Sequence, residues 1–316
     1  MSKNIMKIIA DILPASDILI DEPLCKHTTF KIGGNADYFV KPQNNEQVVL
    51  LVKTLSNEKI PFFILGNGSN LLAKDEGFRG VIIYIGENLS NILVIKADTS
   101  LSNKKDEKTL IKAGAGAMLT RVSRVACENS LTGMEFACGI PGSIGGAVMM
   151  NAGAYSGEIK DIIVDATVCD RQGNILVLNN EELKLSYRHS IIEEKKYVVL
   201  EATFALDKGN KETINKEMME LLAKRKEKQP LEYPSAGSTF KRPEGYFAGK
   251  LIMDAGLRGY SVGGAQISEK HCGFVVNKGG ATQQDVLKLI EYAAGEVYKK
   301  FGVKIEPEVK ILEEEQ

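Results

Sequence analysis

An uncharged, glycine-rich segment at residues 136–157 constrains the fold of this chain more than any other feature. It reads FACGIPGSIGGAVMMNAGAYSG, and by length alone it would suit a membrane span. Its content argues against one, because Pro141, Asn151 and six glycines would leave backbone groups unsatisfied in lipid. Glycine instead allows tight turns and close approach to a ligand. We therefore expect irregular backbone here, placed against another part of the chain or a ligand.

Composition narrows the functional class. The chain has 316 residues, which suggests two or three domains of roughly 100–200 residues each. Hydrophobic residues make up 44% and charged residues 26%, which is typical of globular proteins. The net charge of −1 and the absence of Trp favour neither nucleic acid nor an anionic membrane as a partner.

Cysteine usage and the N-terminus bear on location. The five cysteines are scattered and form no CxxC pair, so we expect neither disulfides nor a metal site. A reducing, cytoplasmic location fits this pattern best. The first ten residues are interrupted by Lys7 and followed by Asp11, without the long apolar stretch of a signal peptide.

The predicted elements follow a mixed α+β order. Apolar periodicity predicts helices at residues 44–59, 119–128, 211–228 and 282–301. Strands are predicted at residues 60–65, 81–85, 88–98, 110–113, 162–170, 174–178, 197–206 and 304–312, with a hairpin turn at 171–173 and a surface loop at 99–108. The polar residues 207–210 are the best linker, so a domain boundary is expected near residue 210.

A second glycine-rich stretch, GNGSN at residues 66–70, precedes the first by about 70 residues. Exposed backbone N–H groups in such loops form an anion nest suited to a pyrophosphate, so the two loops could clamp one dinucleotide. The alternative is that both are tight turns in a β-rich fold. Neither the GxGxxG strand–turn–helix pattern nor a P-loop GK[ST] is present, which disfavours a Rossmann domain and a nucleoside triphosphatase.

The proline-rich segment QPLEYPSAGSTFKRP at residues 229–243 is the next candidate. Its three prolines fix an irregular backbone that would hold Ser235, Ser238, Lys241 or Arg242 in place. An ordinary domain-joining loop is the alternative. None of the three histidines lies in a context that indicates a Ser-His-Asp arrangement.

Two shorter motifs carry charged groups. Arg188, in YRHS, could hold a carboxylate bidentately, although a surface arginine would give the same pattern. Glu306 and Glu308 flank Pro307, which keeps the residue before it extended. The alternative to a functional role for these two glutamates is a solvated strand end.

Taken together, these segments resemble the UDP-N-acetylenolpyruvoylglucosamine reductase family, flavoenzymes of peptidoglycan precursor synthesis. The matching pieces run in order along nearly the whole chain: HTTFKIGG at 27–34, LGNGSN at 65–70, CGIPGSIGGAVMMNAGAYSGE at 138–158, YRHS at 187–190, QPLEYPSAGSTFKRP at 229–243, KLIMDAGLRGYSVGGAQISEKHCGFVVN at 250–277 and EPEV at 306–309. Seven such motifs in sequence are highly specific.

The resemblance implies a fold and a cofactor. We expect a two-part FAD-binding domain of the vanillyl-alcohol-oxidase (PCMH) type at residues 1–210, followed by an α/β substrate-binding domain at residues 211–316. FAD is expected to be non-covalent, since the first loop has no histidine or cysteine and Cys138 is the only such residue near the second. The residues expected to bind it are Gly66, Asn67, Gly68, Ser69, Asn70, Gly139, Ile140, Pro141, Gly142, Ser143, Gly145, Gly146 and Asn151.

The resemblance also implies the reaction. NADPH reduces the flavin, which then reduces UDP-N-acetylglucosamine enolpyruvate to UDP-N-acetylmuramate. Hydride transfer to the vinyl group pushes negative charge toward the substrate carboxylate, and one preorganised donor there is typically worth about 2.7–4 kcal/mol. By the family's motifs, Arg188 would stabilise that charge, Glu308 would support the enolate in its protonated form, and Ser238 would donate the proton.

The candidates for binding the substrate diphosphate are Arg242 and His271, which lie in matching motifs, and Lys228, which directly precedes one; Lys241 is a further possibility, and surface charge is the alternative for each. The chain resembles the shorter branch of the family, without an extra tyrosine-bearing loop, so no tyrosine lid is expected. We expect no metal, nucleic acid, membrane insertion or obligate protein partner. Two rival functions are an oxidase that passes electrons to oxygen and a sugar-nucleotide-binding regulator without chemistry.

Overall fold

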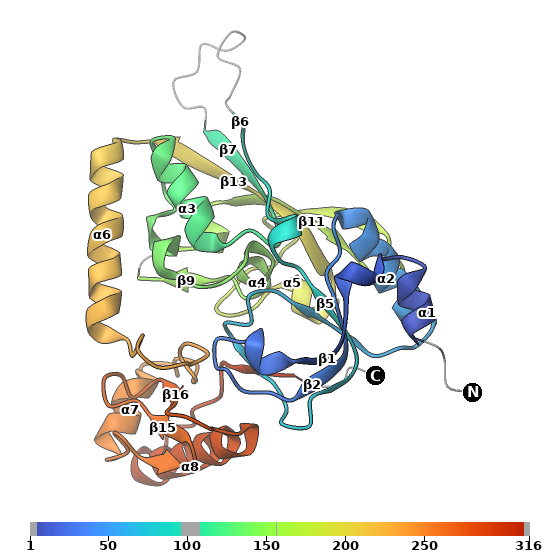
Figure 1. Ribbon diagram of the computed structural model, residues 1–316. Coiled ribbons are helices and arrows are strands. Elements are labelled where there is room, and N and C mark those ends of the chain that lie inside the picture. The colour runs from blue at the N-terminus through green and yellow to red at the C-terminus, as the bar shows by residue number, and fades with distance from the viewer. Residues whose placement is uncertain (1–4, 96–107, 156, 313–316) are drawn as a thin grey trace.

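The computed structural model describes residues 5–95, 108–155 and 157–312, and Figure 1 shows how its parts are arranged. The chain begins with a four-stranded sheet of order β1-β2-β5-β3, in which β2 and β3 both run parallel to β5. Its elements, with neighbouring short ones, are α1 (Ile5–Ala10), η1 (Ala15–Asp17), β1 (Ile18–Pro23), η2 (Leu24–Lys26), β2 (Asn35–Val40), α2 (Asn45–Asn57), β3 (Phe62–Leu65), β4 (Leu71–Leu72) and β5 (Phe78–Tyr84).

Strand β5 is buried on both faces, as its almost continuous apolar sequence requires in a parallel arrangement. Val81 and Ile83 face the largest core cluster, while Phe78 and Ile82 belong to a smaller cluster on the opposite side. Helix α2 confirms the helix predicted from apolar periodicity. The side chain of its N-cap residue, Asn44, accepts a hydrogen bond from the backbone N–H three residues later.

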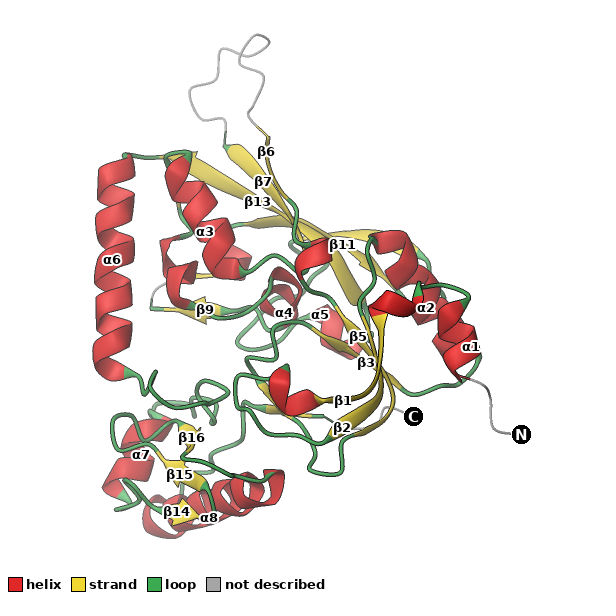
Figure 2. Ribbon diagram, in the orientation of Figure 1, coloured by secondary structure: helices red, strands yellow, loops and turns green. Residues whose placement is uncertain are grey.

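A second, larger sheet has the main order β12-β11-β13-β7-β6, with β8 paired to β13. The elements of this part are η3 (Glu87–Leu89), β6 (Ile92–Ile95), β7 (Thr109–Gly114), α3 (Leu119–Glu128), β8 (Leu131–Thr132), η4 (Glu135–Gly139), α4 (Ile144–Met149), β9 (Gly153–Ala154), β10 (Gly157–Glu158), η5 (Ile159–Asp161), β11 (Ile163–Cys169), β12 (Ile175–Asn179), α5 (Ile191–Glu194) and β13 (Val198–Lys208). Figure 2 shows that this sheet lies beside the first, and the largest core cluster includes residues from both.

The predicted hairpin of β11 and β12 is confirmed. Gly173 has a φ of +82°, and a carboxylate oxygen of Asp170 accepts hydrogen bonds from the backbone N–H groups of Gln172 and Asn174. Both features are typical of a tight turn. Of the predicted strand at 88–98, the described residues appear as the end of η3 followed by β6, and residues 96–98 lie outside the described residues. The predicted loop at 99–108 also lies outside them, except for residue 108.

The C-terminal part combines a small antiparallel sheet, β14-β15-β16, with helices and has its own core. Its elements are α6 (Lys211–Lys228), α7 (Ala248–Asp254), β14 (Ser261–Val262), β15 (Ala265–Ile267), β16 (Val275–Asn277), α8 (Gln283–Phe301) and β17 (Lys310–Ile311). Helix α8 confirms the predicted last helix. A capping box of Thr282 and Asp285 begins it, and Gly302, with a φ of +68°, ends it.

The predicted strand at residues 304–312 is wrong in extent. Only β17 is a strand, and it pairs in parallel with β4 in the N-terminal part. Pro307 has no backbone N–H to give to a ladder, and the segment around it instead forms an isolated bridge with Phe240. The segment 304–312 is therefore tied to two different parts of the molecule.

The two halves of the chain interlock. Helix α6 contacts α3 and η4 of the N-terminal part, and Figure 1 shows it running along that part down to the C-terminal one. In the other direction, Phe30, Ile32 and Leu72 pack into the C-terminal core. The domain boundary near residue 210 stays a prediction. Among the described residues, no helix is long and apolar enough to cross a membrane, and no group of three or more possible metal-ligating side chains gathers in one place.

Candidate active site

The two glycine-rich stretches line one cavity of about 960 Å³, which we call the loop cavity. They also contact each other: Asn67 donates a hydrogen bond from Nδ2 to the carbonyl oxygen of Pro141, 2.6 Å away. A Cβ on Gly66 would lie 2.3 Å from Oγ of Ser143, so glycine is required for this close approach. The loops, far apart in sequence, form one wall.

Most of the predicted cofactor-binding residues line the loop cavity: Gly66, Asn67, Gly68, Ser69, Asn70, Ile140, Pro141, Gly142, Ser143 and Gly146. Gly139, Gly145 and Asn151 are not among its lining residues. A Cβ on Gly139 would lie 3.0 Å from the side chain of Arg225, and Gly145 donates its backbone N–H to Ala115.

Asn151 is fully buried and organises the neighbouring backbone. Its Nδ2 donates to Glu158 Oε2 at 2.9 Å and to the Ser186 carbonyl at 3.1 Å, while its Oδ1 accepts the N–H of Lys160. Because Ser186 begins the turn that carries Arg188, Asn151 links the second glycine-rich loop to the predicted catalytic residues.

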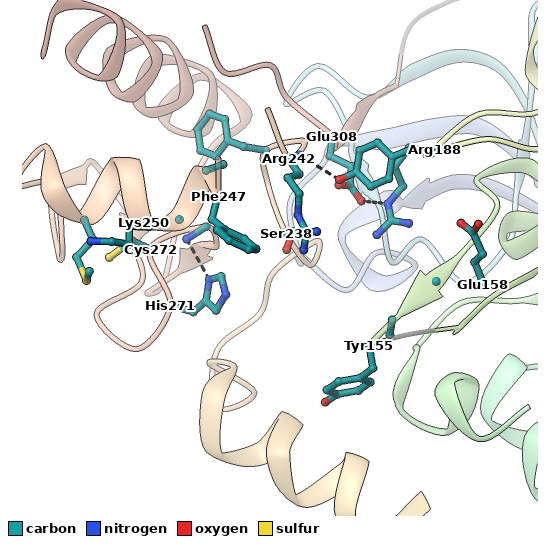
Figure 3. Close-up of a pocket in the computed structure, with 18 of the residues that line it drawn as sticks. Tyr155, Glu158, Arg188, Ser238, Arg242, Phe247, Lys250, His271, Cys272 and Glu308 are labelled. Atoms are coloured by element: carbon teal, nitrogen blue, oxygen red, sulfur yellow. Dashed lines mark hydrogen bonds and ion pairs between the residues drawn. The ribbon is translucent and has the colours of Figure 1, made fainter. Parts of the chain in front are cut away.

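A second cavity of about 830 Å³, the adjacent cavity, lies between this region and the C-terminal part. Arg188, Ser238 and Glu308 line both cavities, and Figure 3 shows them together. The three come from a turn before α5, from the proline-rich segment and from the segment before β17. The fold thus gathers the predicted catalytic residues where the two cavities meet.

Arg188 occupies a strained position. Ser186 and His189 exchange backbone hydrogen bonds of 3.1 Å across a tight turn, and Arg188 within it has a φ of +54°, which is uncommon for a residue other than glycine. Its Nε donates to Glu308 Oε1 at 2.6 Å, and the side chains are only 21% and 11% exposed. The turn thus directs the guanidinium toward Glu308, which lies 120 residues later in the sequence.

The segment that carries Ser238 is held on both sides. The backbone N–H of Thr239 donates to Gly273, and its carbonyl accepts the N–H of Glu308 at 2.7 Å. The hydroxyl of Thr239 accepts the N–H of Val275. Ser238 and Glu308 are therefore fixed next to each other through the backbone of one intervening residue.

Two of the four predicted substrate-binding residues, Arg242 and His271, line the adjacent cavity. Lys228 and Lys241 line neither cavity. Lys228 is the exposed last residue of α6, and Lys241 pairs with Glu306 at 3.5 Å.

His271 has a defined tautomer. Its Nδ1 accepts the backbone N–H of Gly273 at 3.1 Å. Burial lowers the pKa of the ring below its usual value of 6.5, which favours the neutral form. A neutral ring with Nδ1 as acceptor carries its proton on Nε2, which is then a donor for an anionic group.

Several lining residues were missed by reasoning from the sequence. Lys250, Arg258 and Lys270 add positive charge to the adjacent cavity, while Thr29 and Arg225 line the loop cavity. All except Arg225 lie in the quoted motifs, but nothing in their spacing singles them out.

Arg225, on α6, has a distinctive environment. Its Nε is buried and has no hydrogen-bond partner among the residues that the structure describes. Burial also lowers the pKa of the guanidinium below its usual value. A buried, unpartnered donor on a wall that also carries two glycine-rich loops fits an anionic group such as a diphosphate.

Comparison with known proteins finds relatives along nearly the whole chain. Residues 36–179, which span both glycine-rich stretches, match an FAD binding domain, and residues 229–312 match the C-terminal domain of UDP-N-acetylenolpyruvoylglucosamine reductase. The reductase of that name from Agathobacter rectalis is 56% identical over 314 residues, covering 99% of this chain and all of the relative.

The chain belongs to the UDP-N-acetylenolpyruvoylglucosamine reductase family. The reductase from Caldanaerobacter subterraneus subsp. tengcongensis is 51% identical over 99% of this chain and 100% of its own length. The solved structure of the reductase from Thermus caldophilus superposes with a TM-score of 0.74 at 32% identity, covering 94% of this chain and 98% of that one. The predicted family, fold class and FAD dependence are confirmed.

Proposed function

We propose that this protein reduces UDP-N-acetylglucosamine enolpyruvate to UDP-N-acetylmuramate with electrons from NADPH, a step of peptidoglycan precursor synthesis. Family membership over the whole chain supports the reaction. The observation that carries the assignment to this site is the position of Arg188, Ser238 and Glu308, which line both the loop cavity and the adjacent cavity. When bound in the loop cavity, FAD would supply the chemistry for accepting and donating a hydride.

The chain's own residues then have distinct tasks. Arg188 uses Nε to hold Glu308, and the N–H groups on its two Nη atoms are suited to a carboxylate. It stabilises the negative charge that develops on the substrate as hydride arrives. Glu308, in the protonated form that the family's motif implies, supports the resulting enolate, and the Ser238 hydroxyl gives its proton to the carbon next to the one that received the hydride. An enolate-like carbon is basic enough to take a proton from a positioned hydroxyl.

The adjacent cavity is the proposed site of the sugar nucleotide. Arg242, whose guanidinium lies 4.6 Å from the centre of the Phe247 ring, and the Nε2–H of His271 are suited to its diphosphate. Lys228 and Lys241 stay predictions as further contacts. NADPH is proposed to use the same cavity in alternation with the sugar nucleotide.

The remaining expectations complete the proposal. The FAD-binding domain is taken as residues 1–210 and the substrate-binding domain as residues 211–316. The reaction is placed in the cytoplasm, which agrees with five free cysteines. Cys138 is buried, with its Sγ 3.6 Å from the Met218 carbonyl of α6, which supports non-covalent FAD. No obligate protein partner is proposed.

The purified protein should be yellow, and acid precipitation should leave the colour in the supernatant. Under nitrogen, NADPH should bleach the flavin, and one equivalent of the enolpyruvyl substrate should restore the colour. An oxygen-dependent oxidase would stall in the same test. A colourless protein that binds the sugar nucleotide would instead indicate a regulator without chemistry.

A further inference from the structure

The motif HTTFKIGG at residues 27–34 has no part in the reaction proposed above, yet it lies against two of the segments that do. On one side it packs against the first glycine-rich loop. The backbone N–H of Thr29 donates to the Gly68 carbonyl at 3.1 Å, and a Cβ on Gly68 would lie only 2.2 Å from the His27 carbonyl oxygen. The motif is thus in direct backbone contact with the wall of the loop cavity.

On its other side the motif reaches the segment that carries the proposed proton donor. The hydroxyl of Thr29 donates to the carbonyl oxygen of Ser235 at 2.7 Å, across 206 residues of sequence. Thr29 also lines the loop cavity, as do Ser235 and Ser238. One short side chain therefore bridges the glycine-rich loop and the serine-bearing segment.

The backbone between Ser235 and Ser238 is permissive. Gly237 has a φ of +75°, and a Cβ placed on it would meet no atom within 4 Å. Side chains do not confine Gly237 itself, whereas Ala236 beside it is buried in the C-terminal core and Ser235 forms an isolated bridge with Val276. The bond from Thr29 to Ser235 ties this segment directly to the motif that contacts the first glycine-rich loop.

The motif itself is held independently of this bond. Phe30 is fully buried in the C-terminal core, and its carbonyl accepts a hydrogen bond of 3.1 Å from Asn277 Nδ2. Removing the Thr29 hydroxyl should therefore leave the segment folded and in place. The link from the hydroxyl to the Ser235 carbonyl would be lost, together with its longer contact with the Gly68 carbonyl at 3.5 Å.

We propose that Thr29 is a positioning residue for proton transfer, which holds the Ser238 segment in register with the first glycine-rich loop through the carbonyl of Ser235. The inference rests on the proposed role of Ser238 as proton donor. Small errors in the position of a reacting group cost large factors in rate. The second half-reaction should therefore be more sensitive to Thr29 than the first.

The test compares three variants by rapid mixing under nitrogen. Thr29→Val keeps the shape and loses the hydroxyl, whereas Thr29→Ser keeps the hydroxyl. Thr28→Val is the matched control, since Thr28 is the neighbouring threonine and its hydroxyl donates to the carbonyl of Ile32, within the same motif, at 3.2 Å. FAD content, the rate of flavin reduction by NADPH and the rate of reoxidation by the enolpyruvyl substrate are measured for each, with Ser238→Ala alongside.

Thr29→Val should retain FAD, be reduced by NADPH within about 2-fold of the normal rate, and be reoxidised by substrate roughly 3-fold to 100-fold more slowly. Thr29→Ser should recover most of that loss, and Thr28→Val should show no change in the ratio of the two rates. Normal reoxidation by Thr29→Val, equal slowing of both half-reactions, or loss of FAD would each overturn the inference. Ser238→Ala separates the two proposals, because its normal reoxidation would overturn the role of Ser238 itself.

Discussion

Replacing Arg188 should damage only one half of the reaction. Its guanidinium contacts Glu308 at 2.6 Å in a place where both side chains are largely shielded from water. Arg188→Ala removes this contact and the charge that would face the substrate carboxylate. Reduction of the flavin by NADPH needs neither of them, whereas reduction of the enolpyruvyl group needs both.

The magnitude follows from the type of contact. A hydrogen bond to a charged group is worth about 1.5–3 kcal/mol, and a donor that faces charge developing in the transition state about 2.7–4 kcal/mol. At about 1.36 kcal/mol for each factor of ten in rate, the larger effect corresponds to roughly 10²- to 10³-fold. Arg188→Lys keeps the charge but not the planar fork, so it should recover only part of this loss.

The assay is flavin absorbance after rapid mixing, with each half-reaction followed separately under nitrogen. Lys184→Ala is the matched control, since Lys184 is an exposed cation in the same left-handed conformation, with a φ of +48°, and lines neither cavity. Because Arg188 and Glu308 act as a unit, the Arg188→Ala/Glu308→Gln double variant should be little slower than Arg188→Ala alone. Reoxidation of Arg188→Ala at the normal rate would refute the assignment, as would equal slowing of both halves.

Three other predictions concern stability and cofactor binding. Burial lowers the pKa of His271 in the folded chain, so the unfolded chain takes up the proton first as the pH falls. The neutral, buried ring therefore contributes stability above a pH of about 6.5, and this contribution is lost on acidification. The drop in thermal midpoint from pH 7.5 to 5.5 should be smaller in His271→Asn, and an unchanged drop would contradict this. Gly66→Ala should lower the free energy of unfolding in denaturant by about 1–3 kcal/mol, because its Cβ would meet Oγ of Ser143. Adding Ser143→Ala should restore most of this stability. If it does not, the strain lies elsewhere. Arg225→Met should weaken FAD binding by roughly 10- to 100-fold in a fluorescence titration, because a buried donor is lost. Lys224→Met, on the exposed side of α6, should leave the affinity for FAD unchanged. If the two variants bind FAD with equal affinity, Arg225 does not belong to the FAD site.

Local patterns in the sequence were sufficient for the main helices and for the β11–β12 hairpin. Helix α3 spans the predicted residues 119–128, and α8 begins one residue after its predicted N-cap, because periodicity and capping are properties of neighbouring residues. The predicted strand at 304–312 failed for a long-range reason. That segment is held by Phe240 and Thr239 on one side and by β4 on the other, which its own composition does not reveal.

The site was predictable in its parts and not in its assembly. The two glycine-rich loops indicate an anion site by composition alone, and they do line one cavity. The contact between Arg188 and Glu308 joins residues 120 positions apart, so only resemblance to a family could pair them beforehand. Basic residues suit a diphosphate, so Lys228 and Lys241 are reasonable predictions, but the sequence does not tell which basic side chains face a cavity and which face solvent.

The most direct test of the central claim is the behaviour of Ser238→Ala in the two half-reactions. If Ser238 donates the proton, it acts only after hydride has reached the substrate. Flavin reduction by NADPH should then stay close to normal, and reoxidation by the enolpyruvyl substrate under nitrogen should slow by at least about 10²-fold, with partial recovery in Ser238→Cys. Reoxidation of Ser238→Ala at the normal rate would show that Ser238 is not the acid and would contradict the catalytic assignment of its segment.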